Sequence, residues 1–491
     1  MALLVPLVLS LIFRLIVIGE YGLHGDEANK VTAVRLYLEL DFTDNVPHPA
    51  GMKLVMAFFL LFLDGSEFVY RLPSTLASSA TIYPIFYIGK RLYSEFIGYM
   101  ASLLWAANIS VLAFATVVKE DGFLTFFWTL AIYYFVRWRE DPKYLKHIGI
   151  AVGLAMASKY TGALLLLLLI PLLFFAFGTV RERPKLSSTV RGMTPYAFVT
   201  FFIVNFVLLI PATIRNIIEW TKIRTDSVNQ SSQQTQVVSK PWFRYILYIM
   251  IKHPIPFLLI LIVGIVFAIR RRGPNEKLLL LWIFFPLVFY SMIPWGFPRY
   301  CHIMHPAFMI VGVKGIVELT NSFYLGIPRF KSSYTLKRSR IVSLSIISLI
   351  LFNSIFIAMS AKPFYRMYTN EFDPSAELDQ EFFLRDNIYD YYLREAIYYV
   401  NEHAADGSII AMDAINVGAF YGRIDLEMVD FQDLPTDLSL WTSNIAYAIV
   451  QNSRTEAGNA VIHAYLQTYL LPVQTYSIDG IIACEVYQIS R

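Results

Sequence analysis

The sequence predicts an all-α polytopic membrane domain followed by a small C-terminal α/β domain. Of its 491 residues 56% are hydrophobic and only 16% are charged, whereas soluble globular chains carry about 25% charged residues. Up to residue 360, apolar runs follow one another, most of them long enough to cross about 30 Å of hydrocarbon. After residue 360 such runs stop, and short β-rich segments appear instead. We therefore expect two domains, 1–360 and 361–491.

The apolar runs give the expected helices in order. They fall at 2–18, 68–89, 95–117, 121–138, 148–178, 195–211, 255–269, 277–294, 303–320 and 341–359. The first run lacks a preceding basic region and a clear cleavage site, so we expect a retained span. The run 148–178 is too long for one crossing and has Lys159 in its middle, where a charge costs about 2.5–3.5 kcal/mol. Two short helices meeting at Lys159 would avoid that cost, which gives about eleven transmembrane helices.

Residues 52–64 are apolar but too few to cross a bilayer, so they favour an interfacial helix in the first outer loop. With this helix in the interface, five basic clusters fall on one membrane side. They are Lys90-Arg91, Arg137 through Lys146, Arg181 through Arg191, Arg270 through Arg272, and Arg329 through Arg340. Because basic loops stay in the cytoplasm, we expect a cell-membrane protein with a cytoplasmic N-terminus and an extracytoplasmic C-terminal domain.

Two further segments carry structural signals. The stretch 212–250 is rich in Gln and Ser, which favours a polar loop, mobile in part. Within the C-terminal domain, 408–414 and 445–451 are typical of strands, and 473–489 of a hairpin around Asp479-Gly480. Residues 388–404 have helical periodicity. A small α/β domain follows from this pattern.

Composition also excludes some functions. The net charge of +4 is too small to suggest nucleic-acid binding. The two cysteines, Cys301 and Cys484, lie far apart, which excludes a disulfide framework. Glycine-rich phosphate loops, serine triads and Cys-x-x-Cys motifs are absent from the sequence.

On this topology the outer face collects ionisable side chains of both signs, which at membrane helix ends are functional candidates. They are Asp26, Glu27, His48, Lys119, Glu120, Asp121, Lys159, Arg299, His302 and His305. Carboxylates suit a general base or a metal, while Lys and Arg suit an anion such as phosphate. The mixture is what group transfer from a phosphorylated carrier needs. His48, His302 and His305, together with His24, could supply ligands for a divalent metal ion, but no metal-binding spacing is present, so a metal stays open.

Several of these residues also have a purely structural interpretation. Asp26-Glu27 could be a solvated turn after the first span, and His48-Pro49 a helix cap before 52–64. The Lys119–Asp121 segment could neutralise itself at the interface. Arg299, in an aromatic-rich segment, could be an interfacial anchor. Lys159 is harder to dismiss, because a lysine between two apolar helices must find water or an anion.

Six segments in order carry a resemblance to a known family. They are HGDEA (24–28), HPAGMKL (48–54), Arg-Leu-Pro-Ser (71–74), KEDGFLTFFWTLAIY (119–133), GLAMASKYTGALLLLL (153–168) and PRYCHIMHPAF (298–308). Together they resemble the GT-C membrane glycosyltransferases, in particular the protein O-mannosyltransferase and aminoarabinose-transferase branch (family 39/83-like). The resemblance covers about residues 1–310. It implies a GT-C type fold for the membrane domain.

The resemblance implies a function as well. The donor would be a polyprenyl-phosphate sugar, dolichyl or undecaprenyl, and an acceptor hydroxyl on a protein, lipid or glycan would receive the sugar with inversion on the outer or lumenal face. Asp26 would be the catalytic base with Glu27 as its neighbour, and Asp121 a second acidic residue of the cavity. Lys159 and Arg299 would bind the donor phosphate.

This sequence also departs from the family pattern. Lys119 occupies a position where many members have Arg, which leaves it as a further phosphate contact. His48 is followed by Pro-Ala where many members have Pro-Pro, so the role of that motif here is open. Some members use a divalent metal and others do not.

Two other function classes remain. A transporter or flippase of a lipid-linked or anionic solute would also need charges at membrane depth. It would usually show internal repeats and a site near the midplane, and neither is visible. A non-catalytic membrane scaffold, whose outer domain binds a partner, would tolerate replacement of Asp26. The glycosyltransferase reaction is the interpretation that the sequence favours.

Overall fold

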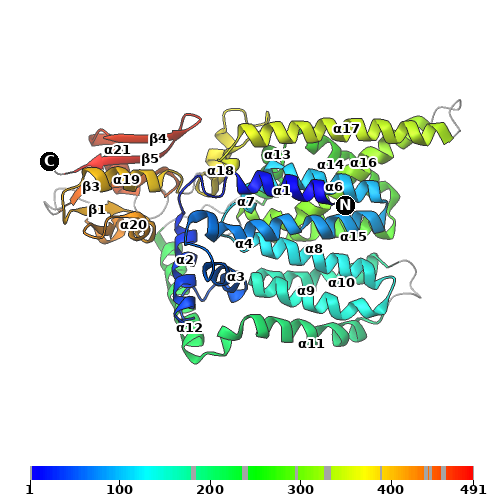
Figure 1. Ribbon diagram of the computed structural model, residues 1–491, viewed down its shortest axis with the longest axis horizontal. Helices are drawn as coiled ribbons and strands as arrows, with labels where there is room; N and C mark the ends of the chain where they lie inside the picture. The colour runs from blue at the N-terminus through cyan, green and yellow to red at the C-terminus, as the bar shows by residue number, and fades with distance from the viewer. Residues whose placement is uncertain are drawn as a thin grey trace.

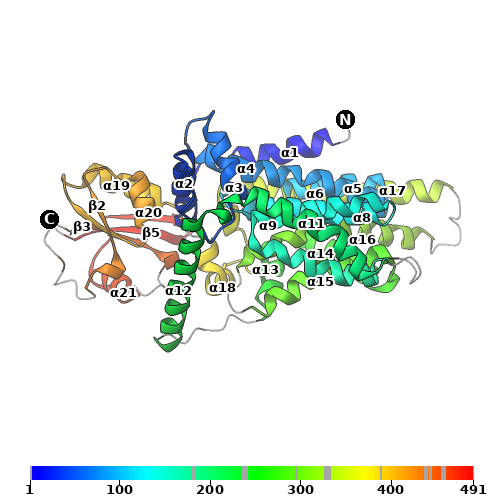
Figure 2. The same ribbon diagram turned by 90° about the horizontal axis from the view of Figure 1, so that it is seen from below.

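The structure is a computed structural model. It describes residues 3–177, 184–234, 242–293, 297–325, 333–387, 390–435, 441, 445–454 and 460–489. A bundle of roughly parallel helices lies beside a C-terminal sheet region, and two helices cross the end of the bundle between them (Figure 1). These crossing helices are α2 (Gly25–Leu38) and α12 (Pro211–Gln234). The view from below has the same order of bundle, crossing helices and sheet (Figure 2).

The bundle is built from the apolar runs of the sequence. Its helices are α1 (Leu4–Leu15), α4 (Glu67–Ala80), α5 (Ile82–Leu92), α6 (Glu95–Ala107), α7 (Ile109–Ala115), α8 (Asp121–Trp138), α9 (Leu145–Ser158), α10 (Leu164–Phe175), α11 (Leu186–Val204), α14 (Ile255–Arg271), α15 (Pro274–Ser291), α16 (His305–Leu325) and α17 (Ser333–Ser360). One continuous hydrophobic core joins α1, α5–α10 and α14–α17. The predicted series of helices in this part of the chain is thus present as a bundle.

Several predicted runs are broken helices. The run 148–178 is two helices, α9 and α10, which meet around Lys159, as the sequence predicts. The run 95–117 is α6 and α7, bent by 60° at Asn108. The run 68–89 is α4 and α5, which join at Thr81. Breaks of this kind leave backbone groups that neighbouring elements must satisfy.

By length and hydropathy alone, the described residues contain two helices able to span a membrane, 298–323 and 338–360, or three if the bent α6–α7 pair counts as one span. Shorter apolar helices include α1, α3 (Ala50–Leu60) and 160–175. The number of about eleven transmembrane helices therefore stays a prediction. Helix α3 has only 11 residues, and Phe58, Leu61 and Phe62 at its end are exposed, which suits the predicted interfacial position.

The prediction of a polar loop at 212–250 is wrong for most of the described residues in this range. Residues 211–234 form helix α12, and 244–252 form helix α13 (Arg244–Lys252). Helix α12 begins at Pro211, whose fixed φ suits a first helical position. Tertiary contacts hold its first turns, since Thr213 Oγ1 and Asn216 Nδ2 donate hydrogen bonds to the carbonyls of Phe42 and Thr43. Composition alone does not reveal such contacts.

The C-terminal region contains a five-stranded sheet in the order β2-β1-β3-β5-β4. Its strands are β1 (Ile409–Met412), β2 (Glu427–Asp430), β3 (Ile445–Gln451), β4 (Gln474–Ile478) and β5 (Ile481–Gln488). The first three strands are parallel, and β4 and β5 form the predicted hairpin at Asp479-Gly480. The short strand β2 has no counterpart in the sequence prediction.

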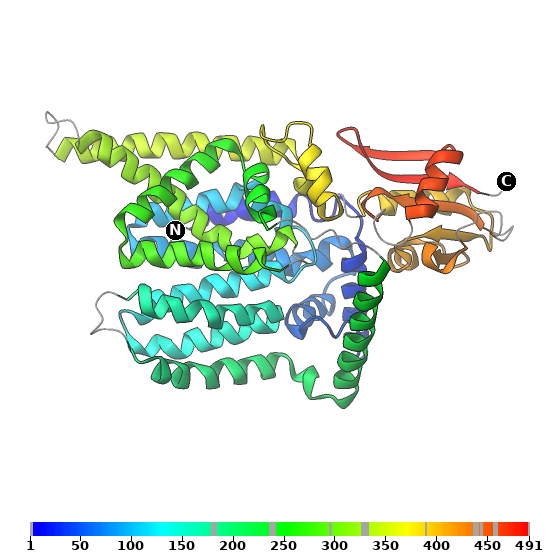
Figure 3. The same ribbon diagram turned by 180° about the vertical axis from the view of Figure 1, so that it is seen from behind.

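Helices α18 (Glu377–Asn387), α19 (Leu393–His403), α20 (Ile415–Tyr421) and α21 (Ala460–Tyr469) complete this region. A second hydrophobic core joins the sheet region to the bundle end, because it contains Val31 of α2, Met52 of α3 and Tyr70 of α4 together with Ile397 of α19 and Val417 of α20. The view from behind shows α12 beside α2, running from the end of α11 toward the sheet region (Figure 3). The sheet therefore packs against the elements that carry the candidate residues.

At the other end of the bundle, polar contacts join the basic helix ends to one another. Arg91 pairs with Glu140, and Arg139 donates to Asn275 at the start of α15. Arg271 and Lys314 both pair with Glu318. Basic groups from α5, α8, α14 and α16 are thus gathered together, as the positive-inside pattern predicts.

Candidate functional site

The candidate site lies where four chain segments meet at the bundle end beside the sheet. These are the N-terminus of α2, the turn 116–120 between α7 and α8, the break at Lys159, and the 3-10 helix η5 (Pro298–Met304). Each segment is a helix end or a break, where side chains can project into a common space. The sequence places one or more of its charged candidates on every one of them.

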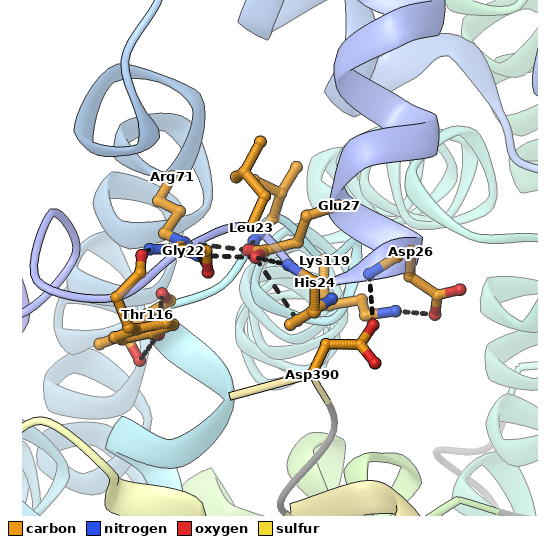
Figure 4. A network of polar contacts seen from close by, with 12 residues as sticks. Gly22, Leu23, His24, Asp26, Glu27, Arg71, Thr116, Lys119 and Asp390 are labelled. Atoms are coloured by element: carbon orange, nitrogen blue, oxygen red, sulfur yellow. Dashed lines mark hydrogen bonds and ion pairs between the residues drawn. The ribbon is translucent and has the colours of Figure 1, made fainter. Parts of the chain in front are cut away.

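Asp26 stands in the first turn of α2 and forms an ion pair with Lys119 (Figure 4). Its side chain is 40% exposed while that of Lys119 is 4% exposed. The pKa of Asp26 is lowered below its usual range, chiefly because of Lys119. Burial lowers the pKa of Lys119 to about 7, with Asp26 opposing the shift. Asp26 is therefore an ionised carboxylate that reaches the solvent-accessible side of the site.

Asp121, the first residue of α8, gathers two cations. Lys159 Nζ donates to Asp121 Oδ1 at 2.8 Å, and Arg299 Nε lies 3.8 Å from Asp121 Oδ2. Lys159 also lies over the ring of Tyr300, 4.7 Å from its centroid. The lysine has an extended backbone between α9 and the following 3-10 turn. The break in the apolar run thus presents Lys159 to a carboxylate and an aromatic face.

Glu120 forms a second node of the cluster. Its Oε1 atom lies 3.4 Å from Lys30 Nζ and 3.1 Å from His48 Nδ1. Burial lowers the pKa of His48, although Glu120 opposes that effect. The structure therefore brings His48 into the cluster with the acidic residues. His48 lies just before the N-cap of α3, Pro49.

The cluster has an excess of positive charge. Asp26, Glu120 and Asp121 are its carboxylates, and Lys30, Lys119, Lys159 and Arg299 are its cations. With Lys119 protonated and His48 neutral, four cations less three carboxylates leave +1. Such a partly buried site favours an anion over water or a cation.

Glu27 belongs to a different network, although it is next to Asp26 (Figure 4). Arg71 donates to both of its carboxylate oxygens, at 3.0 and 2.7 Å, and the amide of Val118 donates to Oε1 at 2.6 Å. The Glu27 and Arg71 side chains are fully buried. Arg71 also donates to the carbonyls of Ile18 and Tyr21. These contacts tie α2 to α4 and to the 116–120 turn.

His302 and His305 are not brought to the acidic residues of the cluster. Both are fully buried, and they pack against each other and against Trp105 and His253. Helix α16 starts only at His305, so His302 is on the 3-10 helix that precedes it. The predicted grouping of His48 with His302 and His305 is therefore not present.

The described residues contain no group of three or more His, Cys, Asp or Glu side chains placed to hold a metal ion. The three carboxylates of the cluster each face a cation of the protein, so they do not form a metal-ligand set. Cys301 and Cys484, both buried, are free thiols.

A cavity of about 770 Å³ opens beside the cluster. Asp26, Lys30 and His48 line it from the site, Trp220 from α12, and Asn416 from α20. The cavity is large enough for part of a drug-sized or glycan-sized ligand. The exposed part of Asp26 faces this space, so a molecule in the cavity can reach the carboxylate.

Sequence reasoning missed Lys30 as a site residue and gave Glu120 no role. Helical spacing could have found Lys30, because it follows Asp26 by four residues on the same face of α2. It also missed Trp220 and Asn416, which come from distant segments. For those two the sequence holds no signal, since only the tertiary fold brings them to the cavity.

Comparison with known proteins identifies the fold. Residues 47–211 match the family model described as dolichyl-phosphate-mannose-protein mannosyltransferase. No curated protein sequence matches the chain. This family is membrane-embedded, which supports the predicted membrane location.

Solved structures match this chain over all or nearly all of its length. ArnT from Cupriavidus metallidurans, bound to undecaprenyl phosphate, is 14% identical with a TM-score of 0.58, and the match covers 99% of this chain and 98% of ArnT. The oligosaccharyltransferase of Archaeoglobus fulgidus, tethered to an acceptor peptide, is 11% identical with a TM-score of 0.54, over 100% and 74% of the two chains. The predicted resemblance to GT-C glycosyltransferases is thus confirmed, and the chain has their mostly helical fold with a small C-terminal sheet.

Proposed function

We propose that this protein transfers a hexosyl or pentosyl group from a polyprenyl-phosphate sugar to an acceptor hydroxyl on the outer or lumenal membrane face, with inversion. The observation that carries the proposal is a partly exposed carboxylate, Asp26, in a cluster with net positive charge beside an open cavity. A phosphate-linked donor needs cations for its leaving group, and an acceptor hydroxyl needs a base. The cluster holds both kinds of group within one fold of the GT-C type.

In the proposed reaction, the acceptor oxygen attacks C1 of the sugar while Asp26 takes its proton. The bond between C1 and the phosphate oxygen breaks, and the electron pair leaves with the polyprenyl phosphate. Lys159 and Arg299 stabilise the phosphate charge, and on donor binding they exchange part of their contact with Asp121 for the phosphate. Lys119, beside Asp26, adds a third positive charge.

The remaining residues of the cluster orient these groups. Glu120 holds Lys30 and His48 beside the cavity. Glu27, bound by Arg71 and the Val118 amide, fixes α2 against the turn that carries Lys119. Glu27 is thus proposed to position Asp26 and Lys119, while Asp26 alone meets the acceptor. The proposed steps use these side chains alone, and Asp26 and Glu120 keep their cation partners when the donor binds.

The proposal includes the orientation and the division of the chain. With the basic helix ends in the cytoplasm, the site and the region 361–491 lie on the outer face, and 1–360 forms the membrane domain. The acceptor enters through the cavity between α2, α12 and α20 and is a protein, lipid or glycan hydroxyl. The elongated polyprenyl chain of the donor lies among membrane lipids.

The test compares purified wild type with Asp26→Asn, using radiolabelled polyprenyl-phosphate sugars and a membrane extract as the acceptor source. Asparagine keeps the shape of the side chain but cannot act as a base. We expect label transfer by the wild type and at least a 100-fold loss in the variant. The matched control is Glu39→Gln, which should retain activity. Glu39 is an acidic residue of the same helix and stands at its C-cap. Equal transfer by wild type and Asp26→Asn would contradict the assignment of the base.

A transporter would behave differently in the same preparation. If no donor is consumed by folded wild type, and reconstituted vesicles instead move a polyprenyl-phosphate lipid across the bilayer, the proposed enzyme activity is wrong.

A further inference from the structure

The C-terminal region forms hydrogen bonds with the start of α2, the helix that carries Asp26. The amide of Leu23 donates to Tyr421 Oη at 2.8 Å, and the amide of Gly25 donates to Asp390 Oδ2 at 2.6 Å. Asn416 Nδ2 donates to the carbonyl of Gly25 at 2.6 Å. The bonding partners come from residues more than 360 positions later in the chain. They hold the backbone on both sides of residue 24.

Asp390 acts as a cap for α2 that comes from another part of the molecule. The first amides of a helix lack intrahelical partners, and a carboxylate there also interacts favourably with the helix dipole. Figure 4 shows Asp390 reaching the start of α2 close to Asp26 and Lys119. The N-cap residue His24 makes its own contacts with Glu27, three residues further on.

Asp390 is itself fixed in place by Arg454. The guanidinium Nε lies 2.8 Å from Oδ1, and Nη2 lies 2.7 Å from Oδ2. The Asp390 side chain is 0% exposed. A bidentate, buried arrangement of this kind defines both the position and the orientation of the carboxylate. The start of α2 is therefore bound by a buried carboxylate that a bidentate ion pair orients.

Gly25 permits the close approach of this pair. A Cβ atom at Gly25 would lie 2.7 Å from Arg454 Nη2 and 3.2 Å from Asp390 Oδ2. Any larger residue would push the pair away from the Gly25 amide. A glycine directly before Asp26 thus lets both side-chain ends approach the backbone at this distance without shifting.

We propose that the Asp390–Arg454 pair is a positioning element for the catalytic base: it fixes the first turn of α2, and with it Asp26, relative to the donor-phosphate cations of the bundle. The inference rests on the proposed function and assigns a role in it to the C-terminal region. Lys119, Lys159 and Arg299 belong to the bundle, whereas Asp26 is on a crossing helix that the C-terminal region holds. Small displacements of a reacting group cost about 100-fold in rate.

The experiment measures kcat and KM for the donor in the full-length protein, with wild type, Asp390→Ala and Asp390→Asn. Asp390→Ala is expected to lower kcat by about 100-fold while KM for the donor stays within about twofold, since its phosphate contacts are all on the bundle. Asp390→Asn should regain part of the lost kcat, because its amide oxygen can still accept from Gly25.

Asp425→Ala is the matched control. Asp425 also forms a bidentate pair with an arginine of the same region, Arg423. This pair is more exposed, and its hydrogen-bond partners belong to the sheet region and not to α2. We expect wild-type kcat for this variant. It reports on any general effect of removing an ion pair from the sheet region.

Hydrogen–deuterium exchange gives a readout that does not need activity. In Asp390→Ala, amides in a peptide covering residues 22–30 should exchange faster, while peptides of β1 and β3 should keep their protection. Asp425→Ala should leave residues 22–30 unchanged.

The outcomes distinguish a failure of the proposed function from a failure of the positioning role. No transfer by folded wild type overturns the proposed function. Transfer by wild type together with equal kcat in Asp390→Ala and Asp425→Ala overturns the positioning role alone. Faster exchange throughout the sheet of Asp390→Ala, with a parallel rise in KM, would also overturn it, since the pair would then only stabilise the region.

Discussion

Lys159, the charge that interrupts the longest apolar run, donates a 2.8 Å hydrogen bond to Asp121 at the start of α8. Arg299 approaches the other oxygen of the same carboxylate, at 3.8 Å. One carboxylate therefore gathers two cations from segments that are 140 positions apart in sequence number. A phosphate group could take the place of Asp121 between them.

Replacing Lys159 should weaken donor binding. Lys159→Met keeps the length and apolar stem of the side chain but removes a charge-assisted contact worth about 1.5–3 kcal/mol, which corresponds to at least a tenfold rise in Kd for undecaprenyl phosphate. Binding can be measured by microscale thermophoresis in detergent. Lys90→Met, which removes an exposed ion pair at the other bundle end, should leave Kd unchanged; equal effects of both variants would argue against a phosphate site at Lys159.

Removing Lys119 should change the pH dependence of the reaction. Asp26 must be ionised to act as a base, and its pKa is lowered chiefly by Lys119. In Lys119→Gln this cause is lost. Burial, which raises the pKa of Asp26, is then opposed only by the more weakly acting cations Lys30 and Arg299. The acid limb of kcat should therefore move to higher pH, whereas wild type keeps its activity well below the usual Asp pKa of about 4. An unshifted acid limb in a pH–rate profile would show that another group titrates.

The Glu27–Arg71 pair should matter for stability. Arg71→Met leaves the fully buried Glu27 charge without its main partner, which typically costs about 3–5 kcal/mol. A large drop in Tm is expected, and Arg71→Met combined with Glu27→Gln should recover part of it. Arg91→Met, which breaks an exposed pair with Glu140, is the control and should change stability by less than about 1 kcal/mol. Similar losses in both single variants would contradict the structural role.

Chelation should not affect transfer. Asp26 and Glu120 are paired with Lys119 and Lys30, so donor binding frees only Asp121 among the site carboxylates, and the described residues contain no group of three or more metal-ligating side chains. Activity in excess EDTA should equal activity with added Mg²⁺ or Mn²⁺. A loss that added metal restores would require Asp26, Glu120 or Asp121 to leave its cation in the working enzyme.

A close-packed helix contact gives a test of the bundle itself. A Cβ atom at Gly153 of α9 would lie 2.5 Å from the carbonyl oxygen of Ala197 on α11. Gly153→Val should therefore force the two helices apart and lower Tm, since overpacking typically costs about 1–3 kcal/mol. Ser187→Val, at an exposed position near the start of α11, is the control and should leave Tm nearly unchanged. An unchanged Tm in Gly153→Val would contradict this helix packing.

The helix break at Lys159, the polar turn at 119–121 and the hairpin at Asp479-Gly480 could be predicted because each rests on local physics. A charge is costly inside an apolar helix, acidic residues favour helix starts, and Gly at positive φ favours a tight turn. Helix α12 and strand β2 could not be predicted in this way. Tertiary hydrogen bonds hold α12, and β2 is only four residues long.

The sequence by itself determined the membrane-like composition, the order of the helices and the charged residues that mark the site, since hydrophobicity and motif spacing are local properties of the chain. Only the tertiary structure decided which of these charges meet. In the fold, Glu27 and Asp26 belong to different networks, and His302 and His305 are buried in the core. Lys30 and Asp390 lie at the site. Such pairings depend on how helix ends and a distant sheet pack together, and ion-pair and hydrogen-bond energies fall off within a few ångströms.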